Sequence, residues 1–430
     1  MRATTPPMGW NSWDCYGTTV TEDEVLANAR HLADHLLPHG WDTVVVDIAW
    51  YDPTARSHGY NADAPIELDA FGRQLPAPVR FPSAAGGMGF APLVAQVHAL
   101  GLKFGLHLMR GIPRRAVALD LPVAGTEWTA RDAADTGSTC EWNPDNYGLD
   151  LDHPAGQAYL DGQIAQIASW GVDLLKVDDM LAPYHHRAIE ALALAVARSG
   201  RDMTVSLSPG THLSTAHVEH LRANAQMWRI SDDLWDRWDD VHAQFARLAR
   251  WAPFQRAGGW ADADMLPLGR IGIRAERGDP RHSRLSADES RTLLTLWTMA
   301  RSPLMMGGDL PTSTPETIAM LANPAIHEVL ARSTGGREFL REPLDGGELI
   351  VWAAQAEGSD RSYAAVFWTG TSPRSVSVPL SSLLGHRAGP VHATDLWRTP
   401  GDAAVDGGRL TTTVPAHGVA WVALDPVPTD

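Results

Sequence analysis

The feature of this chain that most limits its fold is a series of short apolar runs, each of which ends on a polar residue. Five of these runs span residues 43–47, 103–107, 173–178, 204–208 and 227–231. They are rich in valine, leucine and isoleucine, and amphipathic stretches separate them, which is the alternation of strands and helices in a parallel sheet. We therefore expect an α/β fold in which helices connect neighbouring parallel strands.

Helix signals between the runs agree with this alternation. Thr21 and Glu24 have the spacing of a capping box, and apolar residues then repeat at helical spacing as far as Leu36. Residues 155–170 and 187–198 also indicate helices. Polar residues gathered at strand ends are typical of a TIM barrel, whose active site lies in the loops that follow the strands. We predict a (β/α)8 TIM barrel with its site at that face.

The pattern of the sequence changes after about residue 338. Segments such as residues 348–353 and 362–368 have the composition of short strands, and glycine, aspartate, serine and proline separate them. This pattern favours an antiparallel β-sandwich. A chain of 430 residues also exceeds the size at which a single core stops growing. We therefore predict a catalytic barrel over residues 1–335 and a C-terminal β-sandwich domain over residues 336–430.

Composition excludes several classes of partner. The net charge of -16 and the pI near 5.5 argue against nucleic acid, because binding to a phosphate backbone needs clustered Lys and Arg. No run of about eighteen apolar residues occurs, and the N-terminus lacks an apolar signal region. We expect no membrane partner and a cytoplasmic location, with secretion possible if a leader was removed. The oligomeric state is left open.

The sequence predicts neither a cofactor nor a metal ion. No glycine-rich segment of the GxGxxG or GxxxxGK(S/T) type lies at a strand-helix junction. The pairs His185 with His186 and Asp262 with Asp264 lack the spacing of a closed zinc site. We interpret them as a surface histidine pair and as loop-capping carboxylates.

Two aspartates at strand ends carry the candidate chemistry. Glycoside hydrolysis requires two carboxylates, and Asp178 and Asp233 hold suitable positions on neighbouring strands. Lys176 precedes Asp178 by two residues, so both side chains point into the barrel, and a close ammonium favours an ionised nucleophile. Asp233 has acidic neighbours in Asp232 and Asp236, which favour the protonated form that a general acid needs.

Seven segments together match one known pattern in the right order. They are residues 7–13 (PMGWNSW), 80–82 (RFP), 101–105 (GLKFG), 170–178 (WGVDLLKVD), 228–233 (WRISDD), 260–266 (WADADML) and 302–305 (SPLM). With these segments the chain resembles glycoside hydrolase family 27, the α-galactosidases and α-N-acetylgalactosaminidases. The resemblance spans about residues 7–330, nearly the whole predicted barrel.

The resemblance implies a role for each matching residue. It makes Asp178 the nucleophile and Asp233 the general acid/base, although Asp179 and Asp232 lie directly beside them. The expected substrate-binding residues are Trp13, Trp50, Lys176, Ser208, Arg229 and Asp264, together with Asp47, Ile48, His107 and Arg110, which lie at or just past the ends of the second and third strands. Among these, Arg229 would hold a carboxylate, Lys176 and Asp47 would reach sugar hydroxyls, and Trp13 would pack on the ring.

The chain departs from the family pattern at the sugar pocket. Members usually carry two consecutive aspartates after the second strand, which bind the axial 4-hydroxyl and the 6-hydroxyl of galactose, but here the pair is Asp47 and Ile48. Where the family usually has Tyr-Ala-Asp after the third strand, this chain has His107 to Arg110. Ser208 begins a Ser-Pro-Gly segment that is closer to the N-acetylgalactosaminidase pattern. The alternative is that Ile48 only packs and that Arg110 pairs with a loop acid.

These observations predict a retaining, exo-acting α-glycoside hydrolase of the α-galactosidase type, which works through a covalent glycosyl-aspartate. The expected partner is a glycoside or oligosaccharide substrate. The same mechanism on an α-N-acetylgalactosaminide, a β-L-arabinopyranoside or an isomaltose-type α-glucoside is an alternative. The remote alternative is an inactive carbohydrate-binding barrel, against which the intact acid pair argues.

Overall fold

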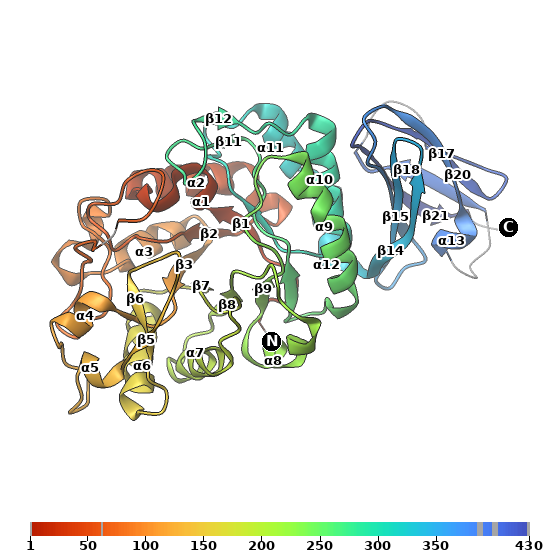
Figure 1. Cartoon of the computed structure of the whole chain (residues 1–430). Coiled ribbons are helices and arrows are strands. Elements are labelled where there is room, and N and C mark those ends of the chain that lie inside the picture. The colour runs from red at the N-terminus through yellow and green to blue at the C-terminus, as the bar shows by residue number, and fades with distance from the viewer. Residues whose placement is uncertain (1, 62, 385–389, 398–402, 428–430) are drawn as a thin grey trace.

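The computed structural model describes residues 2–427 apart from residues 62, 385–389 and 398–402. A barrel of strands and helices forms the larger part of the molecule, and a smaller body made mainly of strands lies beside it (Figure 1). The larger part precedes the smaller one along the chain, as the sequence predicts.

Eight parallel strands form the barrel sheet. In their order across the sheet they are β10 Trp260–Asp262, β9 Met227–Arg229, β8 Thr204–Leu207, β7 Leu174–Asp178, β3 Lys103–Met109, β2 Thr43–Val46, β1 Met8–Asn11 and β13 Leu304–Met306. A parallel bridge from Leu266 to Met306 joins the segment after β10 to the other edge strand. The sheet therefore closes on itself, and the predicted TIM barrel is confirmed.

Helices cover the outside of the barrel because each has one apolar face. The principal ones are α2 Glu22–His35, α3 Ala91–Ala99, α6 Pro154–Ser169, α7 His186–Arg198, α8 Val218–Asn224, α9 Trp238–Trp251, α10 Ala287–Ala300, α11 Pro315–Leu321 and α12 Pro324–Arg332. The capping box at Thr21 and Glu24 begins α2 as predicted. All five apolar runs and the two other predicted helices also appear, with ends that differ by a few residues.

Two small sheets lie in connections that follow barrel strands, at the C-terminal face of the barrel. The long connection after β3 folds into β4 Ile112–Pro113, β5 Ala134–Thr139 and β6 Asn146–Leu149, with the short helices α4 Arg114–Ala118 and α5 Ala130–Ala133. The hairpin of β11 Arg270–Ile271 and β12 Arg281–His282 lies in the connection after β10. The sequence analysis did not predict these elements, because such short strands leave no periodic signal.

The C-terminal part consists of two antiparallel sheets, so the predicted β-sandwich is confirmed. The five-stranded sheet has the order β14 Ser333–Leu344, β15 Gly347–Ala356, β16 Ser362–Trp368, β21 Val419–Pro426 and β18 Val391–Asp395. The three-stranded sheet has the order β17 Arg374–Pro379, β20 Arg409–Val414 and β19 Ala404–Asp406. Strand β14 runs across the predicted division between residues 335 and 336, which stays a prediction.

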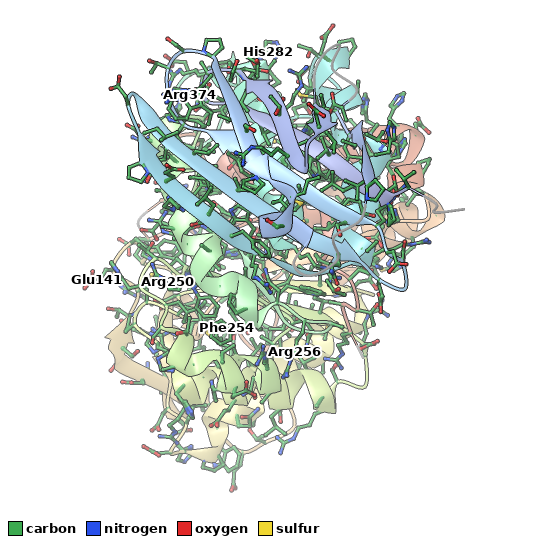
Figure 2. All side chains as sticks on the ribbon, turned by 90° about the vertical axis from the view of Figure 1, so that its right-hand side faces the viewer. Glu141, Arg250, Phe254, Arg256, His282 and Arg374 are labelled. Carbon is green, nitrogen blue, oxygen red and sulfur yellow. The ribbon has the colours of Figure 1, made fainter. Side chains whose placement is uncertain are left out.

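Successive side chains along each strand of the larger sheet point to opposite faces, and in this sheet both faces are apolar. Leu349 and Val351 belong to the core between the two sheets, whereas Ile350 and Trp352 belong to the core shared with the barrel. The ring of Phe367 also meets Phe245 of α9 with 5.0 Å between centroids. Figure 2 looks onto this side of the molecule and shows the sandwich strands lying over barrel helices. Because one face packs on the barrel, the two parts share a continuous core.

Two further properties concern the chain as a whole. Cys15 and Cys140 are both buried and neither forms a disulfide.

Among the described residues no helix combines the length and the apolar character that crossing a bilayer demands.

We predict that Asn28→Ala destabilises the barrel by about 1–3 kcal/mol, the cost of leaving buried polar groups without partners. Asn28 is fully buried in α2. Its amide nitrogen donates to Asp309 and to the carbonyl of Glu24, and its oxygen accepts from the backbone of Leu310. Urea unfolding of Asn28→Ala against an exposed control, Gln96→Ala, measures the difference. Equal midpoints for the two variants would contradict this role.

Candidate active site

A cavity of about 560 Å³ opens at the C-terminal ends of the barrel strands. Seven of the predicted site residues line it, namely Trp13, Asp47, Ile48, Lys176, Asp178, Arg229 and Asp233. They come from the ends of β2, β7 and β9 and from the segment after β1. The structure therefore brings residues that are far apart in the sequence together at the face where a barrel builds its site.

Asp178 is the last residue of β7 and lies among groups that favour its charged form. His107 of β3 places Nε2 3.3 Å from Oδ2 of Asp178. Burial alone would raise the pKa of Asp178, but His107, Lys176 and the hydroxyl of Ser208 outweigh it and leave the pKa below its ordinary value. Asp178 is therefore ionised at neutral pH, as a nucleophile must be.

Lys176 and Asp47 form a buried ion pair between β7 and β2. The ammonium Nζ lies 2.7 Å from Oδ2 of Asp47, and the amide nitrogen of Asn11 donates to the same oxygen at 2.8 Å. Burial opposes the charge on Asp47, but Lys176 and His107 more than compensate and hold its pKa well below the usual range. Lys176 keeps its proton for the same reason, because Asp47 and Asp178 raise its pKa.

Asp233 follows β9 and lies beside a second buried cation. Arg229 Nη2 is 3.2 Å from Oδ1 of Asp233, and Nη1 is 2.7 Å from Oδ1 of Asp264. The side chain of Asp233 is 37% exposed whereas that of Asp264 is 1% exposed. Asp233 can therefore reach a ligand in the cavity, while Asp264 lies behind Arg229. Burial raises the pKa of Asp264 and Arg229 opposes that rise.

Asp236 does not act as the acidic neighbour that the sequence analysis expected. Arg281 binds it through two nitrogens, at 2.9 Å and 2.6 Å. The backbone of Arg284 also donates to it. Asp236 therefore anchors a loop, and its charge is already neutralised. The other acidic neighbour named in the sequence analysis, Asp232, is exposed.

Three aromatic rings form one wall of the cavity. Tyr60 lies nearly parallel to Trp13, with centroids 6.2 Å apart, and Trp142 continues the row 5.7 Å beyond. Flat rings with a polar edge suit the apolar faces of a sugar. The sequence analysis missed Tyr60 and Trp142 because both lie in irregular connections, where no spacing marks the side that a residue faces.

Ile48 and Ser208 differ in their relation to the cavity, because Ile48 lines it and Ser208 does not. Ile48 follows β2, is 2% exposed, and presents an apolar side chain to the cavity. Ser208 follows β8 and is buried behind Asp178. His107 is also completely buried, so it supports Asp178 and does not itself line the cavity.

Five of the predicted substrate-binding residues do not line this cavity, namely Trp50, His107, Arg110, Ser208 and Asp264. Trp50 is completely buried, donates its indole hydrogen to the carbonyl of His107 at 2.8 Å, and packs against Phe90. Arg110 binds Asp179, with Nη2 2.7 Å from Oδ2. Neither side chain lines the cavity, because a position just past a strand end does not fix the direction of a side chain. The pair of Arg110 with Asp179 agrees with the alternative given in the sequence analysis, in which Arg110 pairs with a loop acid.

A second cavity of about 380 Å³, lined in part by Arg110, lies between β3, β7 and the helices α6 and α7. Its walls are mainly apolar, and neither Asp178 nor Asp233 lines it. Among the described residues, the set of side chains with metal-ligand spacing is on α7 and α8, away from both catalytic candidates.

Comparisons with known proteins identify the family of this arrangement. The family model described as "Alpha galactosidase A" matches residues 146–331, and that of the "Alpha galactosidase C-terminal beta sandwich domain" matches residues 346–424. A family 27 β-L-arabinopyranosidase from Geobacillus stearothermophilus is 44% identical, with a TM-score of 0.95 over 100% of this chain and 98% of that one.

Two further relatives bear other names. The structure of a putative α-N-acetylgalactosaminidase from Bacillus halodurans is 38% identical, with a TM-score of 0.88 over 99% of each chain. An α-galactosidase from Cyamopsis tetragonoloba is 25% identical over 98% of this chain and 86% of its own length. The relatives therefore agree on the family and differ in the sugar that their names give.

We predict that Lys176→Met destabilises the protein by about 3–5 kcal/mol at neutral pH, because it leaves Asp47 as a buried charge without its cation. Because the pairing lowers the pKa of Asp47, its contribution to stability is present above the ordinary carboxyl pKa of about 4 and is lost as the pH falls below it. Urea unfolding of the variant between pH 3 and pH 7 measures both effects.

The matched control is the double variant Lys176→Met with Asp47→Asn, which removes both charges and keeps the shape of both side chains. We expect it to recover a large part of the lost stability at pH 7. A single variant as stable as the wild type, or a double variant no better than the single one, would show that the pair is not what holds Asp47.

Proposed function

The chain belongs to glycoside hydrolase family 27 and is a glycoside hydrolase of the α-galactosidase type, and from this premise we propose that it removes terminal β-L-arabinopyranosyl units with retention of configuration. The observation that carries the choice of sugar is Ile48, an apolar side chain in the cavity where the family pattern has a carboxylate for the 6-hydroxyl. β-L-Arabinopyranose has the ring of α-galactose without C6, so it offers no group that such a carboxylate would bind.

The two steps of the reaction use Asp178 and Asp233. A carboxylate oxygen of Asp178 attacks the anomeric carbon while Asp233 donates its proton to the leaving oxygen, and a glycosyl ester of Asp178 forms. Asp233 then accepts a proton from water, the water oxygen attacks the same carbon, and Asp178 is released. The ionised state of Asp178 and the exposure of Asp233 in the same cavity support these roles.

The remaining charged groups support binding of the sugar hydroxyls. Asp47 keeps the place that the family pattern assigns to the axial 4-hydroxyl, which galactose and β-L-arabinopyranose share. Lys176 lies between Asp47 and Asp178, so its ammonium can donate to a hydroxyl near either carboxylate. Trp13 and Tyr60 belong to the aromatic wall of the same cavity.

A terminal α-galactoside is the second candidate substrate. The α-galactosidases among the curated relatives favour it, and the Ser208 segment favours an N-acetylgalactosaminide less strongly. A substrate with C6 would have to place its hydroxymethyl group against Ile48, where it would lose the hydrogen bonds that it makes in water.

We predict that Asp178→Asn lowers kcat by about 10³-fold or more, because an amide cannot form the covalent intermediate. Steady-state kinetics on nitrophenyl β-L-arabinopyranoside, with circular dichroism to confirm folding, measure the effect. The matched control is Asp179→Asn, the adjacent aspartate that binds Arg110, and we expect it to keep far more activity. The reverse order of the two variants would make Asp179 the nucleophile.

We also predict that kcat/KM on nitrophenyl β-L-arabinopyranoside exceeds that on nitrophenyl α-galactoside by about 10²-fold, the discrimination that an apolar pocket exerts against an added hydroxyl. Ile48→Asp should shift this ratio toward the galactoside, because a carboxylate can accept from the 6-hydroxyl. Ile48→Val keeps the apolar surface and serves as the control. A wild type that prefers the galactoside, with Ile48→Asp no better on it, would show that Ile48 only packs.

A further inference from the structure

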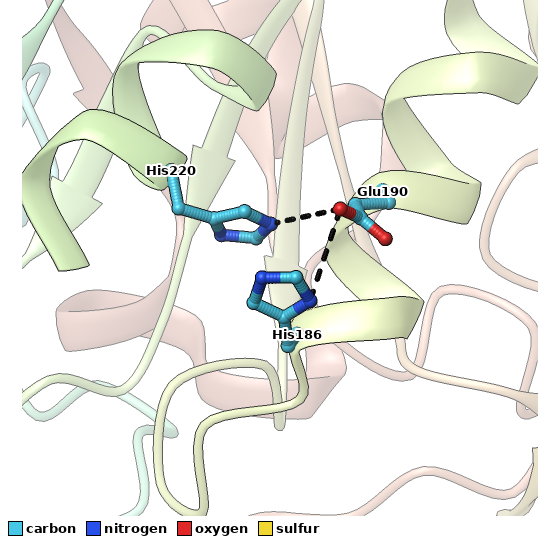
Figure 3. Close-up of side chains that lie close together, drawn as sticks. All are labelled: His186, Glu190 and His220. Atoms are coloured by element: carbon cyan, nitrogen blue, oxygen red, sulfur yellow. Dashed lines mark ion pairs between the residues drawn. The ribbon is translucent and has the colours of Figure 1, made fainter.

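Three side chains on the outside of the barrel converge on one point, away from the active-site cavity. His186 and Glu190 belong to α7 and His220 belongs to α8, and their rings and carboxylate face one another (Figure 3). We propose that they form a binding site for a divalent transition-metal ion of the zinc class. The chemistry of the family does not require such a site, and the sequence analysis predicted none.

The spacing of the donor atoms fits a metal of that size. Oε1 of Glu190 lies 3.8 Å from Nδ1 of His186 and 3.6 Å from Nε2 of His220. Zinc binds nitrogen and carboxylate oxygen at about 2.0–2.2 Å in a tetrahedron, which puts neighbouring donors about 3.3–3.6 Å apart. All three donor atoms already lie within 4.8 Å of one another. The two distances from Oε1 of Glu190 therefore need to shorten by no more than a few tenths of an ångström to reach this spacing.

Two of the three proposed ligands come from one face of α7, and the third comes from α8. His186 and Glu190 are one helical turn apart, so their side chains leave the same face of α7. His220 approaches from α8, which packs beside α7. The side chains of His186 and Glu190 are more than half exposed, so an ion can enter from solvent and the ligands can adjust to it. The fourth position of a tetrahedral ion would face water.

His220 is held in the orientation that a ligand needs. The hydroxyl of Tyr184 lies 2.6 Å from Nδ1 of His220, and the ring of His217 stacks on Tyr184 with 3.8 Å between centroids. When Nδ1 carries the proton and donates it to Tyr184, Nε2 is left with a free lone pair that points toward Glu190. Nε2 is buried and makes no hydrogen bond of its own. One ring nitrogen with a hydrogen-bond partner behind it, and the other nitrogen unpartnered, is typical of a metal-binding histidine.

The donor set indicates which ions fit. Two imidazole nitrogens and one carboxylate oxygen suit zinc and the neighbouring metals of its row, whereas magnesium and calcium prefer oxygen alone. The rings of His186 and His220 are stacked with 3.8 Å between centroids, so the two imidazoles lie next to each other at this point. A bound ion would join α7 to α8, the helices that follow β7 and β8.

The test uses the full chain after treatment with EDTA. Co²⁺ serves as the probe, since its visible absorption reports coordination, and calorimetry with Zn²⁺ gives the affinity and the stoichiometry. We expect one ion per chain and a rise in Tm of about 2–4 °C at saturating Zn²⁺. Glu190→Gln and His220→Ala should each weaken binding at least tenfold. Tyr184→Phe, which removes only the hydroxyl behind His220, should weaken it about 10–100-fold.

The matched control is His212→Ala, which removes an exposed histidine from the connection between β8 and α8. We expect it to bind Co²⁺ and Zn²⁺ as the wild type does. Glu190→Gln keeps the size of an exposed side chain, so it tests the site without disturbing the fold. A wild type with no Co²⁺ absorption, or a Glu190→Gln variant that binds as tightly as His212→Ala, would overturn the proposal.

Discussion

The arrangement of the site depends on one buried ammonium. Lys176 lies on β7, two residues before Asp178, and reaches across the barrel to Asp47 after β2 at 2.7 Å. Without a cation at this place, two carboxylates could not both remain charged so far from water. The same ammonium therefore ties two strands together, keeps Asp47 ionised, and favours the charged form of Asp178.

A second buried cation, two strands away in the sheet, also lies between carboxylates. Arg229 on β9 lies between Asp233 and Asp264, and its side chain is 3% exposed. Each catalytic candidate thus has a fixed positive group at hand, but their surroundings differ, since Asp178 is enclosed by His107 and Lys176 whereas Asp233 opens to solvent. In the mechanism that we propose, this difference lets one carboxylate attack while the other exchanges a proton with the leaving group and with water.

Much of this could be predicted from the sequence, because the barrel strands and the helix that starts at Thr21 carry local signals. The positions of Asp178 and Asp233 followed from strand ends and from the resemblance to the family. The direction of a side chain in an irregular connection carries no such signal. Arg110 was therefore expected in the pocket but binds Asp179, and Tyr60 was missed although it lines the cavity. The three-residue cluster of α7 and α8 could not be found either, since its members meet only through helix packing.

In the mechanism that we propose, Asp178 forms a covalent bond to the anomeric carbon of a sugar that lacks C6, and water then displaces Asp178 from the opposite face, which the leaving group had occupied. Proton NMR of the first sugar released from nitrophenyl β-L-arabinopyranoside tests this most directly, before mutarotation mixes the anomers. We expect β-L-arabinopyranose to appear first. Appearance of the α-anomer first would mean that water attacks directly, with Asp178 acting as a base, and would contradict the covalent mechanism.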